Sequence, residues 1–231
     1  MDVAEVVAGS PEIQGSGASA QEVLTGWGRT APTRATVVDA STGLGAEPAA
    51  VVEPRAESRM VSDLLAHPSQ PPVSVIARGL GRSYGDAAQN AGGVVLRLPA
   101  DPVPEPGPMI DVPAGVSLDD LLRRSVPAGY FVAVTPGTRF VTHGGALASD
   151  IHGKNHHSAG SFSQHVEEFT LVLPDGQSRV VRPGEELFEA TAGGMGLTGI
   201  VTSMRVRMQP IETARMAFCV SWCPVTTMIL V

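Results

Sequence analysis

Apolar and polar residues alternate over short stretches of this chain, and few stretches hold one period for long. Residues 57–67 place Met60 and Leu64 on one helical face, which predicts a helix. Two runs rich in β-branched residues, 73–77 and 93–98, predict short buried strands. These elements are brief and separated by glycine and proline, which is typical of a domain with many turns.

The clearest helix signal begins at Ser117. Ser117 and Asp120 have the spacing of a capping box, and leucines at 118, 121 and 122 form an apolar stripe. Arg123 and Arg124 suit the negative C-terminal end of a helix, and Gly129 lies beyond that end. A helix is therefore predicted after Ser117.

The last part of the chain has the pattern of strands with a helix between them. Residues 169–181 predict a hairpin around the Pro-Asp-Gly turn at 174–176. Residues 184–191 predict a short helix. In residues 200–210, apolar and small side chains alternate with Arg205 and Arg207, which predicts a half-buried strand. The mixed order predicts an α+β fold and not a regular βαβ repeat.

Composition limits the function classes. The chain has 231 residues, 43% of them hydrophobic and 17% charged, which is typical of a globular protein with a substantial core. Its net charge of −7 argues against nonspecific nucleic-acid binding. Cys219 and Cys223 are the two cysteines, and their spacing is not that of a redox pair. Neither a signal peptide nor a transmembrane segment is recognisable, so the expected location is cytoplasmic or peripheral to the cell envelope.

Glycines gather in a first glycine segment, residues 77–86, directly after a predicted strand. Gly79 and Gly81 let backbone N–H groups approach an anionic group without obstruction by a Cβ atom. The spacing is one residue too long for a dinucleotide-binding fingerprint, and no Lys-Ser/Thr follows to make a nucleoside-triphosphate loop. A plain tight turn remains the alternative interpretation, although Arg82 and Asp86 are more polar than a bare turn requires.

Two more glycine segments follow. The second glycine segment, residues 135–153, combines Pro-Gly-Thr, Gly-Gly and a run of small residues where a flat ligand could lie against the backbone. The third glycine segment, residues 193–202, runs into a predicted strand. One such segment is weak evidence, but three of them in one domain predict an extended ligand that touches the backbone at several points. A dinucleotide cofactor has that shape.

The sequences "ARGLGRSYGD", "PGTRFVTHGGALASDIHGKNHHSAGSF" and "GGMGLTGIV", in this order, resemble the flavin-binding half of the vanillyl-alcohol-oxidase-type flavoproteins. The resemblance runs from about residue 24 to about residue 212. It implies a PCMH-type FAD-binding domain of two small α+β subdomains at residues 21–212. Residues 1–20 are small, polar and aperiodic, which predicts a disordered lead-in. Residues 213–231 are expected to be an aberrant or truncated tail, with the substrate-binding cap domain missing.

The resemblance implies a set of FAD contacts spread over all three glycine segments. They are Arg78, Gly79, Leu80, Gly81, Arg82, Ser83 and Tyr84; Pro136, Gly137, Thr138, Thr142, Gly144, Gly145, Ala148, Ile151 and His152; and Gly196, Gly199, Ile200 and Val201. Many relatives hold FAD covalently through a histidine of the first segment. Arg82 occupies that position here, so the FAD is expected to be noncovalent.

The implied activity is that of an oxidoreductase, with His152 beside the flavin and Tyr84 near the flavin or the substrate entry. A hydride would pass from the C2′ hydroxyl of a lipid-linked ribose to FAD, in synthesis of a cell-wall arabinan precursor. A partner reductase would complete the epimerisation. The alternative is a truncated, catalytically inactive remnant that at most binds FAD. His143 departs from the small aliphatic residue expected before Gly-Gly, and it would either crowd the flavin or point away.

His152, His156 and His157 lie within six residues and raise the question of a metal site. A pair at i and i+4 would need a helix to share one face, and Gly153 makes a helix there unexpected. With no obvious third ligand elsewhere, a metal-dependent hydrolase is the weakest alternative. For His156 and His157 a structural role in a polar loop stays open.

Overall fold

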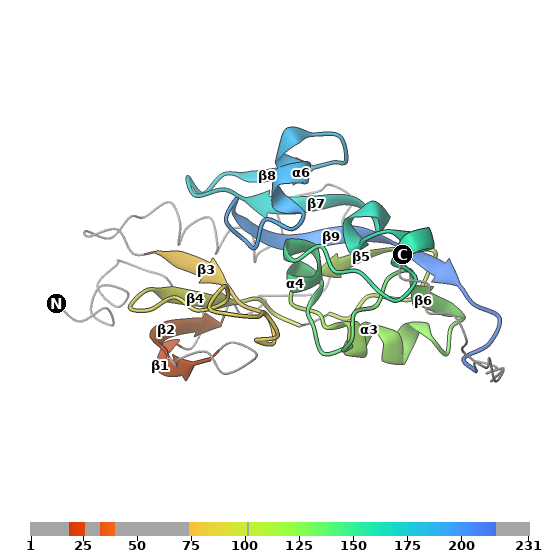
Figure 1. The fold of residues 1–231 in the computed structure, drawn as a ribbon, viewed down its shortest axis with the longest axis horizontal. Helices are drawn as coiled ribbons and strands as arrows, with labels where there is room; N and C mark the ends of the chain where they lie inside the picture. Colours follow the sequence, from red (N-terminus) through yellow and green to blue (C-terminus); the bar gives the residue numbers. More distant parts are fainter. Residues whose placement is uncertain (1–18, 26–32, 40–73, 101, 216–231) are drawn as a thin grey trace, which may run out of the picture.

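The computed structural model describes residues 19–25, 33–39, 74–100 and 102–215 (Figure 1). Two β-sheets organise this part of the chain. The first is a four-stranded sheet in the order β1-β2-β4-β3, formed by β1 (Ser19–Leu24), β2 (Thr33–Asp39), β4 (Val94–Arg97) and β3 (Val75–Ala77). β1 is antiparallel to β2, whereas β2 and β3 both run parallel to β4.

The second sheet is antiparallel throughout. It contains β5 (Met109–Pro113), β9 (Ile200–Pro210), β7 (Val166–Val172) and β8 (Ser178–Val181) in that order, and β6 (Tyr130–Val132) also pairs with β9. The long strand β9 is therefore the centre of this sheet. Figure 1 shows the first sheet at one end of the molecule and the second sheet in the remainder.

Short helices connect the strands of the second sheet. They are α3 (Leu118–Ser125), α4 (His143–Ala148), α5 (His156–Ala159), the 3₁₀ helix η1 (Phe162–His165) and α6 (Glu186–Thr191). α3 and α4 pack on the second sheet through buried leucines at 118, 121 and 147. No helix within the described ranges is long and apolar enough to cross a membrane.

Apolar clusters stabilise the second sheet and join it to the first. The main core lies in the second sheet and its helices and includes Phe162, Phe169 and Met204. A smaller cluster joins Val94 and Leu96 of β4 to Val172 of β7 and Ile200 of β9. Because this cluster draws residues from both sheets, burial of its apolar surface fixes one sheet against the other.

Most of the predicted elements in the described residues are present, and the α+β class is confirmed. In α3 the Ser117 hydroxyl oxygen accepts the N–H of Asp120 at 3.1 Å and donates to its carboxylate at 2.6 Å. The hairpin turns at Gly176, which has φ +80°, a value that favours glycine. The helix predicted over residues 57–67 lies outside the described residues.

Two expectations differ in detail from the structure. β1 begins at Ser19, so residues 19 and 20 belong to a strand and not to a disordered lead-in. In β9 Arg205 and Arg207 are exposed and the residues of the opposite face are buried, as expected, but Val201 and Ser203 are buried as well, so alternation is lost before Met204. The reason is that Ile200 packs in the cluster between the sheets while Val201 packs in the main core, so both faces of β9 are covered there.

Candidate functional site

The first glycine segment leaves β3 and is braced by Arg78. The N–H of Arg78 donates to the carbonyl of Leu96 at 2.9 Å. Its guanidinium donates to the carbonyl oxygens of Ala88 and Thr25, each at 2.7 Å. Desolvation by the surrounding chain lowers the pKa of Arg78 from its usual value. Arg78 therefore holds this segment in place through both its backbone N–H and its guanidinium.

The residues after Arg78 present backbone donors. Among the described residues, no backbone carbonyl accepts the N–H groups of Gly79, Leu80, Gly81 or Ser83. Gly81 has φ +67°, and the Arg82 guanidinium donates to the Leu80 carbonyl at 2.8 Å, which closes a tight turn. Successive N–H groups in such a turn form a concave arrangement that favours an anion.

The first and second segments meet at Gly79. A Cβ atom on Gly79 would overlap the side chain of Thr142. Thr142 is the N-cap of α4, and its hydroxyl oxygen accepts the N–H of Gly145 at 3.2 Å. Glycine at position 79 thus allows the first segment to lie directly against the start of α4.

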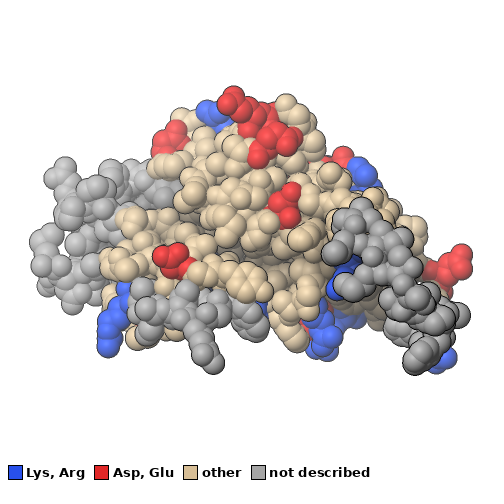
Figure 2. Space-filling model, viewed as in Figure 1, with Lys and Arg blue, Asp and Glu red and all other residues tan. Residues whose placement is uncertain are grey.

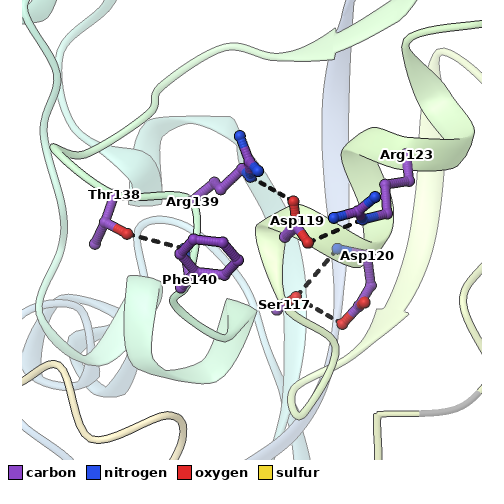
Figure 3. A network of polar contacts seen from close by, with 7 residues as sticks. All are labelled: Ser117, Asp119, Asp120, Arg123, Thr138, Arg139 and Phe140. Atoms are coloured by element: carbon purple, nitrogen blue, oxygen red, sulfur yellow. Dashed lines mark hydrogen bonds and ion pairs between the residues drawn. The ribbon is translucent and has the colours of Figure 1, made fainter.

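The second segment is fixed by the first turn of α3 (Figure 3). The N–H of Asp119 donates to the Arg139 carbonyl at 3.1 Å, and that of Leu118 to the Val141 carbonyl at 2.9 Å. The Asp119 carboxylate pairs with Arg139 at 2.5 Å and Arg123 at 2.9 Å. Desolvation alone would raise the pKa of Asp119, but its bonds to the two arginines outweigh it and lower that pKa.

Within the second segment, Gly144 allows α4 to approach the end of β5 closely. A Cβ atom on Gly144 would lie 3.0 Å from the Cβ of Ala114, and its N–H donates to the Ala114 carbonyl at 2.9 Å. The Gly-Gly pair thus belongs to a short helix where a ligand-contacting loop was expected. Only the N-cap signal at Thr142 could have predicted that helix.

His143, within the second segment, is buried in the core against Phe162. It is fully buried, its Nδ1 lies 2.7 Å from the Val116 carbonyl oxygen, and its ring meets Phe162 edge to face at 6.2 Å. Its Nε2 has no hydrogen-bond partner within the described part of the chain. Burial lowers the pKa of His143 to about 4, against a smaller opposite effect of the Val116 carbonyl.

The third segment docks on the C-terminal end of α4. The N–H of Gly193 donates to the Leu147 carbonyl at 3.0 Å, and the N–H of Met195 to the Ala148 carbonyl at 2.8 Å. Gly196 follows with φ +79°. The side chains of Ile200 and Val201 face the core, which leaves their backbone as the part able to meet a ligand. All three glycine segments therefore converge on α4.

Comparison of the sequence with known protein families shows the family to which this chain belongs. A family model described as an FAD binding domain matches residues 48–182, a range that holds the first and second glycine segments whole. The chain belongs to this FAD-binding family. Its α+β fold is the PCMH-type FAD-binding domain, as the sequence motifs predicted.

Two relatives are similar to this chain over most of its length. The chain is similar to decaprenylphosphoryl-beta-D-ribose oxidase of Mycolicibacterium smegmatis, with 48% identity over 198 residues that cover 83% of this chain and 40% of the relative. It is also similar to cytokinin dehydrogenase 5 of Arabidopsis thaliana, with 30% identity over 180 residues, 71% of this chain and 32% of the relative. The chain thus spans less than half of the length of either relative.

The surface around the glycine segments carries both polar groups that suit the phosphates of FAD and apolar groups that suit its rings. The N–H groups of Gly79, Leu80, Gly81 and Ser83, which no carbonyl of the described residues accepts, suit phosphate oxygens. Large apolar side chains on all three segments are at least partly exposed; they are Leu80, Tyr84, Phe140, Met195 and Leu197. A flat aromatic ring system can be covered by such side chains, so the residues present fit FAD.

His152 is exposed and emerges from the end of the second segment. Its backbone forms an antiparallel bridge with Ser161, and its ring meets that of His156 edge to face at 5.8 Å. The His156 ring meets that of His157 in the same way at 5.8 Å. Within the described residues no hydrogen bond or ring contact joins His152 to Tyr84, which is 78% exposed on the first segment.

No helix was expected to carry His152 and His156 together, and none does. α5 forms a single turn, but it begins at His156, so His152 and His156 do not share a helix. The Gly153 carbonyl accepts the N–H of His156 at 3.1 Å, so the chain turns between these two residues, directly before α5 begins. No group of three or more potential ligands for a metal ion occurs in the part of the chain that is described.

The residues that position the second segment from outside it were not anticipated. Asp119 lies in the first turn of α3, and its carboxylate binds Arg139 of the second segment. No sequence signal reveals that pairing, because the two residues lie twenty positions apart. The Pro-Gly-Thr motif at 136–138 indicates a turn, but it does not indicate which residue holds that turn in place.

Substitution of Gly153 tests how His152 is held. A Cβ atom at Gly153 would lie 2.7 Å from the Thr135 carbonyl oxygen, which is backbone and cannot rotate away. Gly153→Ala is therefore expected to lower the free energy of unfolding by about 1–3 kcal/mol. Urea denaturation measures it, with Gly107→Ala as control, since a Cβ there meets only the Met109 carbonyl oxygen at 3.6 Å. Equal midpoints for the two variants would contradict the close contact.

Proposed function

We propose that this chain binds FAD noncovalently as part of an oxidoreductase that oxidises a hydroxyl group of a lipid-linked sugar, of the decaprenylphosphoryl-ribose type. The observation that carries the proposal is the 48% identity to decaprenylphosphoryl-beta-D-ribose oxidase over 83% of the chain. The likeness to cytokinin dehydrogenases supports the broader class of oxidoreductase but not the sugar substrate.

In this proposal the first segment binds the pyrophosphate. The N–H groups of Gly79, Leu80, Gly81 and Ser83 supply uncharged donors, and the Arg78 brace keeps them in place. Such donors need no basic surface, which is consistent with a net charge of −7. Figure 2 shows acidic and basic side chains scattered over one face of the molecule, with much uncharged surface between them.

The second and third segments contact the rest of the cofactor. When bound, FAD supplies the acceptor for a hydride from the substrate carbon. Pro136, Gly137 and Thr138 are proposed to present a backbone edge to FAD. Thr142 lies against Gly79 of the first segment, and Gly144, Gly145 and Ala148 of α4, which Thr142 caps, are proposed to contact FAD as well. Ile151 and His152 follow, and the backbone of Gly196, Gly199, Ile200 and Val201 completes the set.

His152 is the proposed proton acceptor for the substrate hydroxyl. Its ring is exposed, and the bridge to Ser161 fixes the backbone that carries it. A histidine held by its backbone and open to a substrate can act as a general base. Tyr84 is proposed to cover the flavin or the substrate entry from the first segment.

Noncovalent binding is proposed from the side chain at position 82. A guanidinium is not a nucleophile under physiological conditions, and that of Arg82 already donates to the Leu80 carbonyl. Acid precipitation of the flavin-loaded chain is expected to release all flavin into the supernatant. Yellow colour that stays with the precipitate would show a covalent bond and contradict this part of the proposal.

Gly137 offers a sharp test of the binding face. A Cβ atom at Gly137 would meet nothing within 4 Å, and its backbone does not need glycine. Gly137→Ala is therefore expected to leave the free energy of unfolding within about 1 kcal/mol of its original value. FAD affinity is expected to fall at least about tenfold, roughly 1.4 kcal/mol, because the methyl group occupies the edge proposed for the flavin.

Fluorescence titration with FAD measures this effect, and Gly107→Ala again serves as the matched control because it lies on no glycine segment. An unchanged affinity in Gly137→Ala would exclude flavin from this edge. A separate assay adds decaprenylphosphoryl-ribose and a redox dye to the loaded chain. Reduction of the dye would support sugar oxidation, whereas FAD binding without turnover would support a flavin-binding module that does not itself oxidise the sugar.

A further inference from the structure

The C-terminal end of α4 is the junction of three parts of the structure. The helix ends with Ser149 as C-cap, and the chain then turns at Asp150. The N–H of Asp150 donates to the Leu147 carbonyl at 2.9 Å, and that of Ile151 to the Ala146 carbonyl at 3.0 Å. This pair of bonds is a Schellman motif, in which the residue after the C-cap takes a left-handed conformation.

Asp150 occupies the position that glycine usually takes in this motif. Its φ is +39°, and Met195, whose N–H binds the end of the same helix, has φ +54°. These are the two non-glycine residues with positive φ among the described residues. Such backbone conformations cost about 1 kcal/mol or more and persist where surrounding contacts compensate for them.

The compensating contact of Asp150 is made by its carboxylate. Its Oδ1 accepts the N–H of Ser163 at 2.9 Å. The next residue, Ile151, accepts the N–H of Phe162 through its carbonyl at 2.9 Å, and His152 forms the bridge with Ser161. The three contacts follow one another in antiparallel order, so the Asp150 side chain adds one more hydrogen bond to a short ladder that ends at His152.

We propose that Asp150 is a positioning residue for His152, and that its carboxylate, bound to the Ser163 N–H, holds the segment that carries the His152 ring. A glycine would satisfy the left-handed backbone better but would lose this bond. The aspartate is explained by the need for both a left-handed turn and a fixed direction of the chain after it. The link to FAD affinity rests on the proposed function, whereas the link to the ladder does not.

Asp150→Gly and Asp150→Asn separate positioning from stability. Asp150→Gly removes the carboxylate and relieves the backbone strain, so its unfolding midpoint is expected to equal or exceed the original one. Its FAD affinity is expected to fall at least about tenfold, roughly 1.4 kcal/mol. Asp150→Asn keeps an acceptor oxygen and tolerates positive φ, so its FAD affinity is expected to stay close to that of the original chain.

Amide hydrogen exchange and the ring NMR shifts of His152 are measured on the full chain without FAD. In Asp150→Gly, protection of the Ser163 amide is expected to fall at least about tenfold, with a shift of the His152 signals, and in Asp150→Asn neither is expected to change. These two readouts decide the inference even if the original chain fails to bind FAD, an outcome that contradicts only the proposed function. An Asp150→Gly chain with unchanged protection and His152 signals would overturn it, as would one that fails to fold.

Discussion

Phe162→Ala is expected to lower the free energy of unfolding by about 3–5 kcal/mol, one of the largest effects available from a single substitution in this chain. Phe162 is 1% exposed in the main core, and its ring meets that of His143 beneath α4. Its N–H also binds the Ile151 carbonyl, next to the bridge that holds His152. Truncation to alanine leaves a cavity under the point where the glycine segments converge.

Urea denaturation measures this loss, and Phe140→Ala is the matched control. Phe140 is 42% exposed, so removal of its ring is expected to cost less than about 1 kcal/mol. In the fraction of Phe162→Ala that stays folded, FAD affinity is also expected to fall, because α4 and the His152 ladder lose their common support. A cost below that of Phe140→Ala would contradict the placement of Phe162 in the core.

The elements that the sequence predicts well are those with local signals. α3 has a cap, an apolar stripe and charges that suit its dipole, and each of these acts within a few residues. The β7–β8 hairpin is encoded in the same way by the Pro-Asp-Gly turn, since Gly176 takes the positive φ that the turn needs. Local consistency of this kind makes such elements readable from one sequence.

α4 shows why other parts are not readable. A helix that contains Gly-Gly has low intrinsic propensity, because glycine costs about 1 kcal/mol relative to alanine. The helix is stabilised by distant contacts, namely the bonds from His143 and Gly144 to the carbonyls of Val116 and Ala114. These partners lie nearly thirty positions away, and nothing in the local sequence indicates them.

The candidate site divides in the same manner. Its glycine segments could be located from the sequence, because close packing at Gly79 and Gly144 leaves little room for a Cβ atom and so favours glycine there. The residues that brace the segments, Asp119 and Asp150, could not, since a carboxylate that binds a distant arginine or backbone N–H looks like any surface acid. The sequence thus indicates where the chain packs closely against its neighbours better than it indicates what holds these segments in shape.

Acid is expected to destabilise this fold partly through His143, and His143→Leu is expected to remove that part. The unfolded chain binds a proton at the imidazole near pH 6.5, whereas burial lowers the pKa of the folded ring to about 4. Between these values the unfolded state holds more protons, so stability falls as pH falls. At roughly 1.4 kcal/mol for each unit of pKa difference, the loss reaches about 3 kcal/mol at pH 4 and is complete below that pH, where the folded ring is also protonated.

Leucine is suitable because the contacts of the ring permit its removal. The Val116 carbonyl that meets Nδ1 also accepts the backbone N–H of His143 at 2.9 Å, so it keeps one partner, and the unpaired Nε2 disappears. At pH 7.5 the variant is expected to lie within about 1.5 kcal/mol of the original chain, since a hydrogen bond is worth about that much. Urea denaturation from pH 7.5 to 4 measures the difference between the two chains, which cancels the contribution of carboxylates such as Asp119. A gain of about 3 kcal/mol by His143→Leu relative to the original chain across this range would identify the buried ring as a source of acid sensitivity. A difference that stays constant with pH would show that the ring is not such a source.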